Sequence, residues 1–235
     1  MKLLISVRSA TEALLAARGG ADFIDLKEPS AGALGALPLA TIRDCVAALR
    51  DYNLPISATI GDCPNDMASA VQRVADCGVD MVKVGIERNA AASAVLKSLS
   101  ACGHAVIPVL IADRGLDVEL VARAASLGFA GLMVDTADKS AGSLFDCVPM
   151  PVLQHFIDSA RAASLMCGLA GALRVDDLPA LMTLAPDFAG FRTAVCNGDR
   201  RGMLDVQRLC ALRQAASRGL LSPSSSERIE SSALL

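Results

Sequence analysis

The chain has 235 residues, of which 53% are hydrophobic and 20% are charged, and its formal net charge is −3. No uninterrupted apolar run approaches the roughly 20 residues that a membrane-spanning helix needs. A nucleic-acid surface is not expected either, because no basic cluster is present, aromatic residues make up only 3% and tryptophan is absent. We therefore expect a soluble, cytoplasmic protein of one domain, a size at which α/β barrels of about 250 residues are common.

Eight cysteines are scattered along the chain, and no two have the CxxC spacing of a metal site or redox motif. Only two histidines, His104 and His155, could assist a metal site. We expect reduced thiols that pack as small hydrophobic side chains, and no bound metal.

Short β-rich runs alternate with alanine- and leucine-rich segments along the chain. Several runs are apolar on both faces, as parallel strands covered by helices must be. The predicted strands are Lys2–Val7, Phe23–Lys27, Ile56–Ile60, Met81–Val84, Ala105–Ile111, Gly131–Asp135, Leu165–Leu169 and Phe188–Arg192. The intervening segments have apolar spacings of three and four residues, which predict amphipathic helices. These helices are Thr11–Arg18, Leu39–Arg50, Met67–Asp76, Ala90–Leu99, Val118–Leu127, Pro151–Ala163, Val175–Leu184 and Leu204–Ser217.

Eight βα units with short connections favour a closed barrel. Glycines such as Gly20, Gly78 and Gly128 end helices, where they can adopt the left-handed C-cap conformation. A doubly wound open sheet is the alternative, but it would more often carry a GxGxxG turn after the first strand, and none is present there. We therefore predict an α/β fold, a single (β/α)₈ TIM barrel over residues 1–218. A flexible C-terminal tail is expected at residues 219–235, where serines and a proline interrupt the periodicity.

Charged side chains at the predicted strand ends indicate where chemistry could occur, because barrel active sites lie at the carboxyl ends of the strands. Asp25 and Lys27 share one strand face, so both are expected to point into the barrel mouth. Lys83 lies on the fourth strand, Asp135 ends the sixth, and Lys139 follows in its loop. Ion pairs alone could explain these charges. However, crowded cations lower the pKa of a lysine and make its neutral amine available as a nucleophile or base.

Small residues and an arginine follow the seventh and eighth strands, the usual phosphate-binding position of such barrels. Glycine lets main-chain N–H groups approach an anion, and an arginine can clamp it with two hydrogen bonds. A further anion site could use residues 197–202, although that loop could be only a hydrated connection. The predicted substrate- or phosphate-binding residues are Gly168, Ala170, Gly171, Gly190 and Arg192.

Eight blocks carry a resemblance to a known family. They are GADFIDLKEP at 20–29, GALG at 32–35, SATIGD at 57–62, VKVG at 82–85, DTADK at 135–139, LFD at 144–146, LAG at 169–171 and GFRTAVC at 190–196. In this order and spacing, over about residues 1–212, the chain resembles the (5-formylfuran-3-yl)methyl phosphate synthases of methanofuran biosynthesis. These are also called 4-(hydroxymethyl)-2-furancarboxaldehyde-phosphate synthases.

The resemblance implies a TIM-barrel lyase that condenses two molecules of glyceraldehyde 3-phosphate into a furan aldehyde phosphate, with loss of phosphate and water and without a cofactor. Lys27 matches the lysine that forms the Schiff base, and Lys83 matches the proton-transfer lysine. Asp25 and Lys139 match further catalytic positions, and Asp135, which opens the same motif as Lys139, could orient it. The implied partner is a phosphorylated triose, and a homo-oligomer is compatible with the apolar outer helices.

Three alternatives remain. Another Schiff-base phosphosugar barrel is one, although a class I aldolase typically carries its lysine on the sixth strand. The motif Asp25-Leu26-Lys27 is also similar to the Asp-x-Lys of orotidine-phosphate decarboxylase relatives, but their second aspartate is missing here. A barrel that only binds a phosphometabolite would need no buried pair of lysines.

Overall fold

A computed structural model describes residues 1–32, 34–61, 66–113 and 115–219. Almost all of the predicted tail at 219–235 therefore lies outside the described residues. In the described part, no helix is long and apolar enough to cross a membrane.

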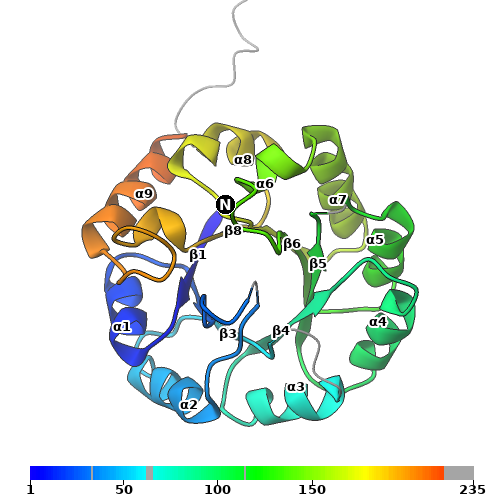
Figure 1. Cartoon of the computed structure of the whole chain (residues 1–235), viewed down its shortest axis with the longest axis horizontal. Coiled ribbons are helices and arrows are strands. Elements are labelled where there is room, and N and C mark those ends of the chain that lie inside the picture. The colour runs from blue at the N-terminus through cyan, green and yellow to red at the C-terminus, as the bar shows by residue number, and fades with distance from the viewer. Residues whose placement is uncertain (33, 62–65, 114, 220–235) are drawn as a thin grey trace, which may run out of the picture.

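Eight parallel strands form a closed barrel in chain order, and the first strand pairs with the last. Figure 1 shows the barrel inside a ring of helices, which confirms the predicted TIM barrel. The predicted strands are all present, and their ends differ by two residues at most. They are β1 Lys2–Val7, β2 Phe23–Leu26, β3 Ile56–Thr59, β4 Met81–Ile86, β5 Val106–Ile111, β6 Gly131–Asp135, β7 Met166–Leu169 and β8 Phe188–Phe191.

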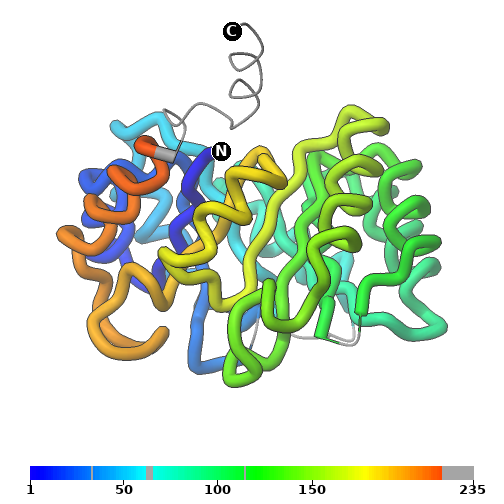
Figure 2. Tube along the Cα trace, turned by 90° about the horizontal axis from the view of Figure 1, so that it is seen from above, coloured from blue at the N-terminus to red at the C-terminus, as the bar shows by residue number. Residues whose placement is uncertain are grey.

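The helices cover the outside of the barrel, and Figure 2 shows the last of them beside the first, where it closes the ring. They are α1 Ala10–Arg18, α2 Leu39–Ala48, α3 Met67–Ala75, α4 Ala92–Ser100, α5 Val118–Ala125, α6 Leu144–Cys147, α7 Met150–Ala162, α8 Leu178–Leu184 and α9 Val206–Gly219. Two short 3₁₀ turns, η1 Val175–Asp177 and η2 Thr193–Val195, precede α8 and follow β8.

Three details of the helices differ from the prediction. The helix expected over Val175–Leu184 is divided into η1 and α8. The last helix begins two residues later than expected, because Leu204 instead forms an antiparallel bridge with Cys196. The short helix α6 was not predicted, and its start is stabilised by the reciprocal hydrogen bonds of a capping box between Ser143 and Asp146.

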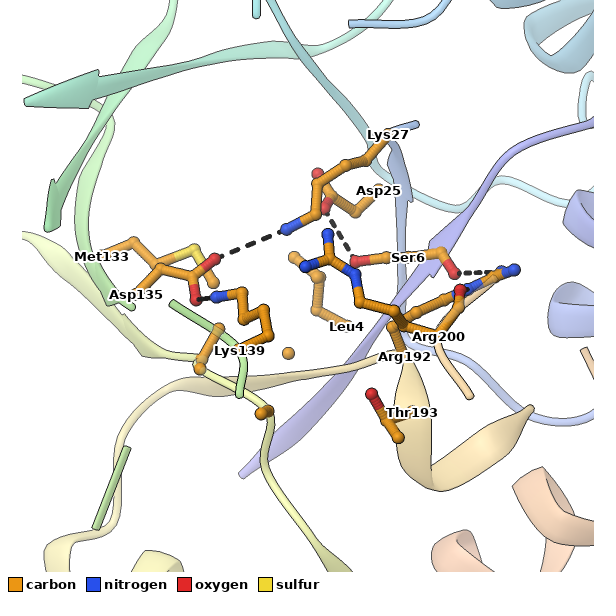
Figure 3. Close-up of a pocket in the computed structure, with 14 residues that line it drawn as sticks. Leu4, Ser6, Asp25, Lys27, Met133, Asp135, Lys139, Arg192, Thr193 and Arg200 are labelled. Carbon is orange, nitrogen blue, oxygen red and sulfur yellow. Dashed lines mark hydrogen bonds and ion pairs between the residues drawn. The ribbon is translucent and has the colours of Figure 1, made fainter. Parts of the chain in front are cut away.

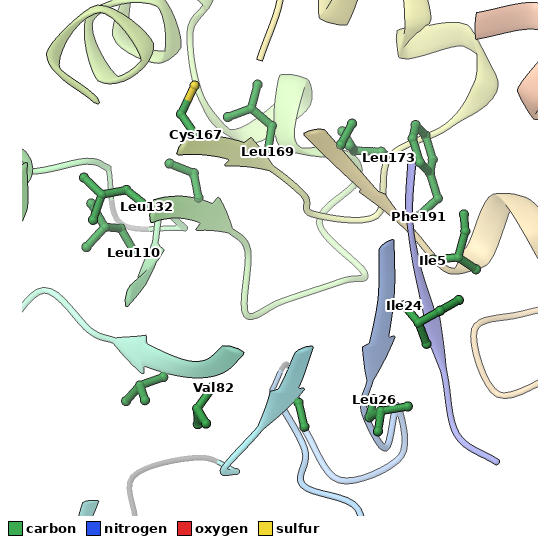
Figure 4. Packing of buried hydrophobic residues seen from close by; sticks show 14 of the residues in the cluster. Ile5, Ile24, Leu26, Val82, Leu110, Leu132, Cys167, Leu169, Leu173 and Phe191 are labelled. Carbon is green, nitrogen blue, oxygen red and sulfur yellow. The ribbon is translucent and has the colours of Figure 1, made fainter. Parts of the chain in front are cut away.

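The core has an outer and an inner part. Outward-facing strand residues such as Ile24, Leu26 and Leu132 pack against the helices (Figure 4). Inside the barrel, an apolar cluster includes Phe23 and Phe188, whose ring centroids lie 5.6 Å apart. Phe23 and Phe188 are the first residues of β2 and β8 and so lie at the amino end of the barrel, whereas the buried charged groups at Lys27 and Asp135 lie at the carboxyl ends of β2 and β6.

Candidate active site

Four of the predicted site residues are buried inside the barrel at the carboxyl ends of the strands. Relative exposures are 2% for Asp25, 1% for Lys83, 2% for Asp135 and 8% for Lys27. The alternation of side chains along β2 turns Asp25 inwards, as predicted. Lys27 follows the last residue of β2, and its N–H still bonds to the carbonyl of Val7 on β1.

Asp25 is the centre of the first charged group. Its Oδ1 lies 3.0 Å from Nζ of Lys83. The hydroxyl groups of Ser57 and Ser6 donate to Oδ1 and Oδ2 at 2.8 and 3.0 Å. Ser6, Asp25 and Ser57 are in register on β1, β2 and β3, which explains why their side chains meet. The strand pairing therefore fixes both oxygens of the carboxylate.

Asp135 is the centre of the second charged group, at the end of β6. Its Oδ2 lies 3.4 Å from Nζ of Lys27, and its Oδ1 accepts a hydrogen bond from Lys139 (Figure 3). The N–H of Thr136 also donates to Oδ1, at 2.8 Å. One carboxylate thus holds two lysines, one from β2 and one from its own loop, at the barrel mouth.

Burial and neighbouring charges change the pKa values of these groups in different ways. Burial by itself raises the pKa of Asp25, but the charges of Lys83 and Lys27 outweigh it and bring the pKa below its ordinary value. For Asp135, the charges of Lys139 and Lys27 likewise outweigh burial, and the pKa falls to about 2. Both carboxylates are therefore ionised at neutral pH.

The lysines lose part of their preference for the charged form. Burial lowers the pKa of Lys83, and Asp25 opposes this only in part, while the charge of Lys27 lowers it further. Burial also lowers the pKa of Lys139, with Asp135 opposing and Lys27 adding to the effect. The two members of the Lys83–Asp25 pair both have lowered pKa values, because Lys83, Lys27 and Ser57 together stabilise the charge of Asp25, whereas Asp25 and Asp135 compensate the burial of Lys83 only in part. A lysine with a lowered pKa is neutral in a larger fraction of molecules near neutral pH, so its amine is more available as a base than that of an ordinary lysine.

A pocket of about 440 Å³, a volume that includes space open to solvent, borders these groups. Lys27, Lys139, Asp25 and Asp135 line one part of it. Lys83 is not among the lining residues, so it reaches the pocket only through Asp25. Among the described residues, no three His, Cys, Asp or Glu side chains are grouped so that they could hold a metal ion.

The small residues after β7 and β8 divide into two groups. Ala170, Gly171 and Gly190 line the pocket, and Gly171 has a φ of +121°, a conformation that favours glycine. The N–H of Ala170 bonds to the carbonyl of Val134 and is therefore engaged within the barrel. Ala170 and Gly190 shape the wall, and Gly171 provides the turn that follows β7.

Gly168 does not lie where an anion cradle was expected. A Cβ atom at this position would come within 2.1 Å of the ring of Phe188, which belongs to the inner apolar cluster. The absence of a side chain makes room for that ring. Gly168 is not among the residues that line the pocket, so the predicted phosphate contact gains no support from the pocket geometry, and the glycine serves packing against Phe188.

Arg192, predicted to clamp a phosphate, lines the pocket but has its guanidinium bonded within the protein. Its guanidinium has five N–H donors, and five hydrogen bonds occupy them. Nη1 and Nη2 donate to Glu12 at 2.5 and 3.1 Å and to the carbonyls of Ser6 and Gly202 at 3.1 and 2.8 Å. Nε donates to the carbonyl of Arg200 at 2.8 Å. Arg192 borders the pocket, but its donors are committed to the protein.

Arg200 lines the pocket, and it belongs to the 197–202 loop that the sequence offered as a second anion site or as a hydrated connection. One residue near the site was missed by the sequence analysis. Asp113, after β5, accepts the N–H groups of Ala137 and Asp138 at 2.5 and 2.9 Å and so fixes the loop that carries Lys139. The position of Asp113 at a strand end was the signal that could have identified it.

The chain is similar to known proteins at two levels, in sequence and in fold. The model of the 4-HFC-P synthase family matches residues 3–213. A protein of Methylorubrum extorquens is 40% identical over 220 residues, which cover 93% of this chain and 92% of that relative. The (5-formylfuran-3-yl)methyl phosphate synthase of Methanosarcina mazei is 36% identical over 217 residues, covering 85% of this chain and 92% of that enzyme.

Solved structures are similar at the level of fold. Phosphoribosyl anthranilate isomerase of Thermus thermophilus superposes with a TM-score of 0.67 and 17% identity, covering 93% of this chain and 99% of that one. At that identity the likeness shows the barrel alone. The match over residues 3–213 and the relatives of 36–40% identity show more: this chain belongs to the 4-HFC-P synthase family.

Proposed function

We propose that this protein condenses two molecules of glyceraldehyde 3-phosphate into 4-(hydroxymethyl)-2-furancarboxaldehyde phosphate, in the biosynthesis of a methanofuran-type cofactor. The observation that carries the proposal is the grouping of Lys27, Lys83 and Lys139 around the carboxylates of Asp25 and Asp135 in one buried site. Atom balance requires that one phosphate and two water molecules leave. The enzyme is thus a lyase that needs a nucleophilic amine and repeated proton transfer.

Lys27 is the nucleophile in this proposal. Its Nζ is at the pocket, held 3.4 Å from Asp135 Oδ2, a distance that orients the amine without a close hydrogen bond. Attack on the aldehyde carbon of the first triose and loss of water form an imine, and hydrolysis of the imine at the end of the reaction returns that water and frees Lys27. The protonated imine withdraws electrons from the adjacent carbon and makes its proton removable, so that carbon can attack the second triose.

Asp25 and Lys83 act together as the base. Asp25 faces the pocket, and its Oδ1 is 3.0 Å from Nζ of Lys83. A proton taken from the carbon beside the imine can pass through Asp25 to Lys83, whose burial lowers its pKa and leaves the neutral amine accessible. Lys139, on Asp135, is placed to protonate leaving oxygens during the dehydration steps.

The phosphate group fits the other end of the pocket. Gly171, Gly190 and Thr193 line that end, where small side chains leave space. Arg200 provides the positive charge there, in place of Arg192, whose donors are engaged. A phosphate bound here would place the rest of the triose towards Lys27, across the same pocket.

The direct test is reduction of the imine. The protein is incubated with glyceraldehyde 3-phosphate and borohydride, and the modified peptide is identified by mass spectrometry. We expect an adduct on Lys27, and without borohydride a furan chromophore and one phosphate released per product. Lys27→Arg should keep the charge and lose both signals, because a guanidinium does not form the imine. Lys97→Arg, an exposed lysine on α4, is the matched control and should retain both.

Two outcomes would separate the alternatives. An adduct on Lys27 without furan or phosphate release would indicate a different Schiff-base aldolase or lyase on the same barrel. An active Lys27→Arg variant would contradict the nucleophile assignment altogether.

A further inference from the structure

Glu12 is a fully buried acid that the proposed chemistry does not use. It lies in the first turn of α1 with 0% exposure, outside the group of lysines. Both of its oxygens are occupied. Oε2 accepts the N–H of Arg8 at 3.0 Å and Nη1 of Arg192 at 2.5 Å, and Oε1 accepts Nη2 of Arg192 at 3.1 Å and the N–H of Leu204 at 3.2 Å. Burying a charge is costly unless it is paired, so the burial of the Glu12 carboxylate depends on these hydrogen bonds and on the charge of Arg192.

Arg192 bonds to Glu12 and also lines the pocket, so it connects the two. Its remaining donors bond to three main-chain carbonyls, those of Ser6, Arg200 and Gly202. Ser6 is at the end of β1, next to the residues that hold Asp25. In Figure 3 a dashed line joins Arg192 to Ser6, on the side of the pocket from which Arg200 also enters. The ion pair therefore connects α1 with both β1 and the segment that carries Arg200.

That segment is a tight hairpin, residues 196–204. Cys196 and Leu204 form an antiparallel bridge, and the N–H of Asn197 bonds to the carbonyl of Met203 at 2.9 Å. At Gly202 a Cβ atom would come within 1.8 Å of the Asn197 carbonyl, so the hairpin closes only with glycine there. The base of the hairpin is thus built from main-chain contacts, and Arg192 and Glu12 bond to its inner edge.

Arg200 extends from this hairpin over the pocket. Its Nη2 donates to the carbonyl of Gly32 at 2.9 Å, in the loop that follows β2. Its charge is close enough to Lys139 to contribute to the lowered pKa of that lysine. Arg200 therefore lies between the β2 side and the β6 side of the barrel mouth, and its position depends on where the hairpin is held.

We propose that Glu12 is a positioning residue for the phosphate end of the pocket: through Arg192 it holds the 196–204 hairpin so that Arg200 faces a phosphate monoester. This rests on the proposed function for the identity of the substrate, but the anion site itself can be measured separately. Without the Glu12 carboxylate, the buried guanidinium of Arg192 has no counter-ion. It would turn towards water and release the carbonyls of Arg200 and Gly202.

The test uses the full-length chain and two readouts. The first is the dissociation constant of inorganic phosphate, and the second is KM and kcat with glyceraldehyde 3-phosphate. We expect Glu12→Gln to weaken phosphate binding and raise KM by about tenfold, with kcat changed less than threefold. Arg200→Gln should have a similar effect. In the double variant, phosphate should bind no more than twofold weaker than to Arg200→Gln alone, because Glu12 acts through Arg200.

Two controls separate positioning from general loss of structure. Asp22→Asn breaks a partly exposed ion pair with Arg213 near the amino ends of the strands, and Arg201→Gln removes an exposed positive charge from the same hairpin. Both should leave phosphate affinity unchanged within twofold. If Glu12→Gln does not fold, as judged by circular dichroism, Arg192→Lys replaces it. This lysine keeps the charge but cannot make five hydrogen bonds, and it should weaken phosphate binding to the same extent.

The proposal is overturned if a folded Glu12→Gln or Arg192→Lys variant binds phosphate as the wild type does. It is also overturned if the effects of Glu12→Gln and Arg200→Gln multiply in the double variant. A wild type that binds phosphate through Arg200 but forms no furan would instead overturn the proposed reaction and leave the positioning role in place. If the wild type forms the furan but Arg200→Gln does not change phosphate affinity, the positioning role is overturned and the proposed reaction stays in place.

Discussion

Replacing Asp25 with asparagine removes the counter-ion of Lys83 while keeping the size of the side chain. Both side chains are 2% exposed, and Nζ lies 3.0 Å from Oδ1. Water cannot take the place of the lost charge without opening the barrel. Ser6 and Ser57 would still contact the amide, so that the change is confined largely to the charge.

The distance between the charges of Lys83 and Asp25 sets the strength of their interaction. At an effective dielectric constant of about 20, two unit charges 3.0 Å apart interact by about 5.5 kcal/mol. Removing one partner of a buried pair typically costs about 3–5 kcal/mol of stability, because the remaining group must either stay charged without compensation or give up its proton on folding. We expect this loss for Asp25→Asn and a smaller one for Lys83→Met, since Asp25 would retain its bonds from Ser57 and Ser6.

Urea unfolding of the wild type, both single variants and the double variant at pH 7 measures the coupling. The double variant should lose less stability than Asp25→Asn alone, because no unpaired charge remains in it. If the two single losses add to within about 0.5 kcal/mol, the pair is not coupled in the folded protein and the reasoning is refuted.

The pH dependence provides an independent check. In Asp25→Asn, burial lowers the pKa of Lys83 with only the weaker charge effect of Asp135 opposing it, so the folded state favours the neutral lysine while the unfolded state protonates it. The unfolded state then binds more protons, and stability must rise with pH, by at most about 1.4 kcal/mol per pH unit. Between pH 6 and 9, the free energy of unfolding of Asp25→Asn should rise with pH more steeply than that of the double variant. Equal slopes in the two variants would contradict the inference that the folded state holds Lys83 neutral.

Three further predictions concern packing, the loop after β6, and acid stability. Gly168→Ala places a methyl group within 2.1 Å of the Phe188 ring and should cost about 1–3 kcal/mol in urea unfolding; an unchanged midpoint would show that the ring moves freely. Asp113→Asn loses one of two main-chain N–H contacts and should lower kcat about tenfold, whereas Asp117→Asn, which alters a comparable cap on α5, should not. The Asp135 pKa of about 2 lies below the ordinary value of 3.8, so its contribution to stability is complete above the unfolded value and is lost as pH falls towards 2. Acid titration of unfolding should show a loss of about 2 kcal/mol that is missing in Asp135→Asn.

The sequence was sufficient for the barrel and for the identity of the charged residues. Strand periodicity and glycine-ended helices are local properties, so they predicted each of the eight strands to within two residues. Alternation along β2 was enough to turn Asp25 into the barrel. It could not show how Lys27 and Lys83 are paired, because that depends on which strand ends the closed barrel brings opposite each other.

The tertiary structure decided the partners. Asp135 forms ion pairs with both Lys27 and Lys139, whereas Asp25 forms its ion pair with Lys83. Arg192 follows a strand where phosphate contacts are common, yet an acid 180 residues away in the chain occupies it. That acid, Glu12, has the sequence position of an ordinary helix cap after Ser9, and only the return of the chain through the 196–204 hairpin buries it. Local patterns determine which face a side chain occupies, whereas its partner is determined by barrel closure and by the loops that fold over its mouth.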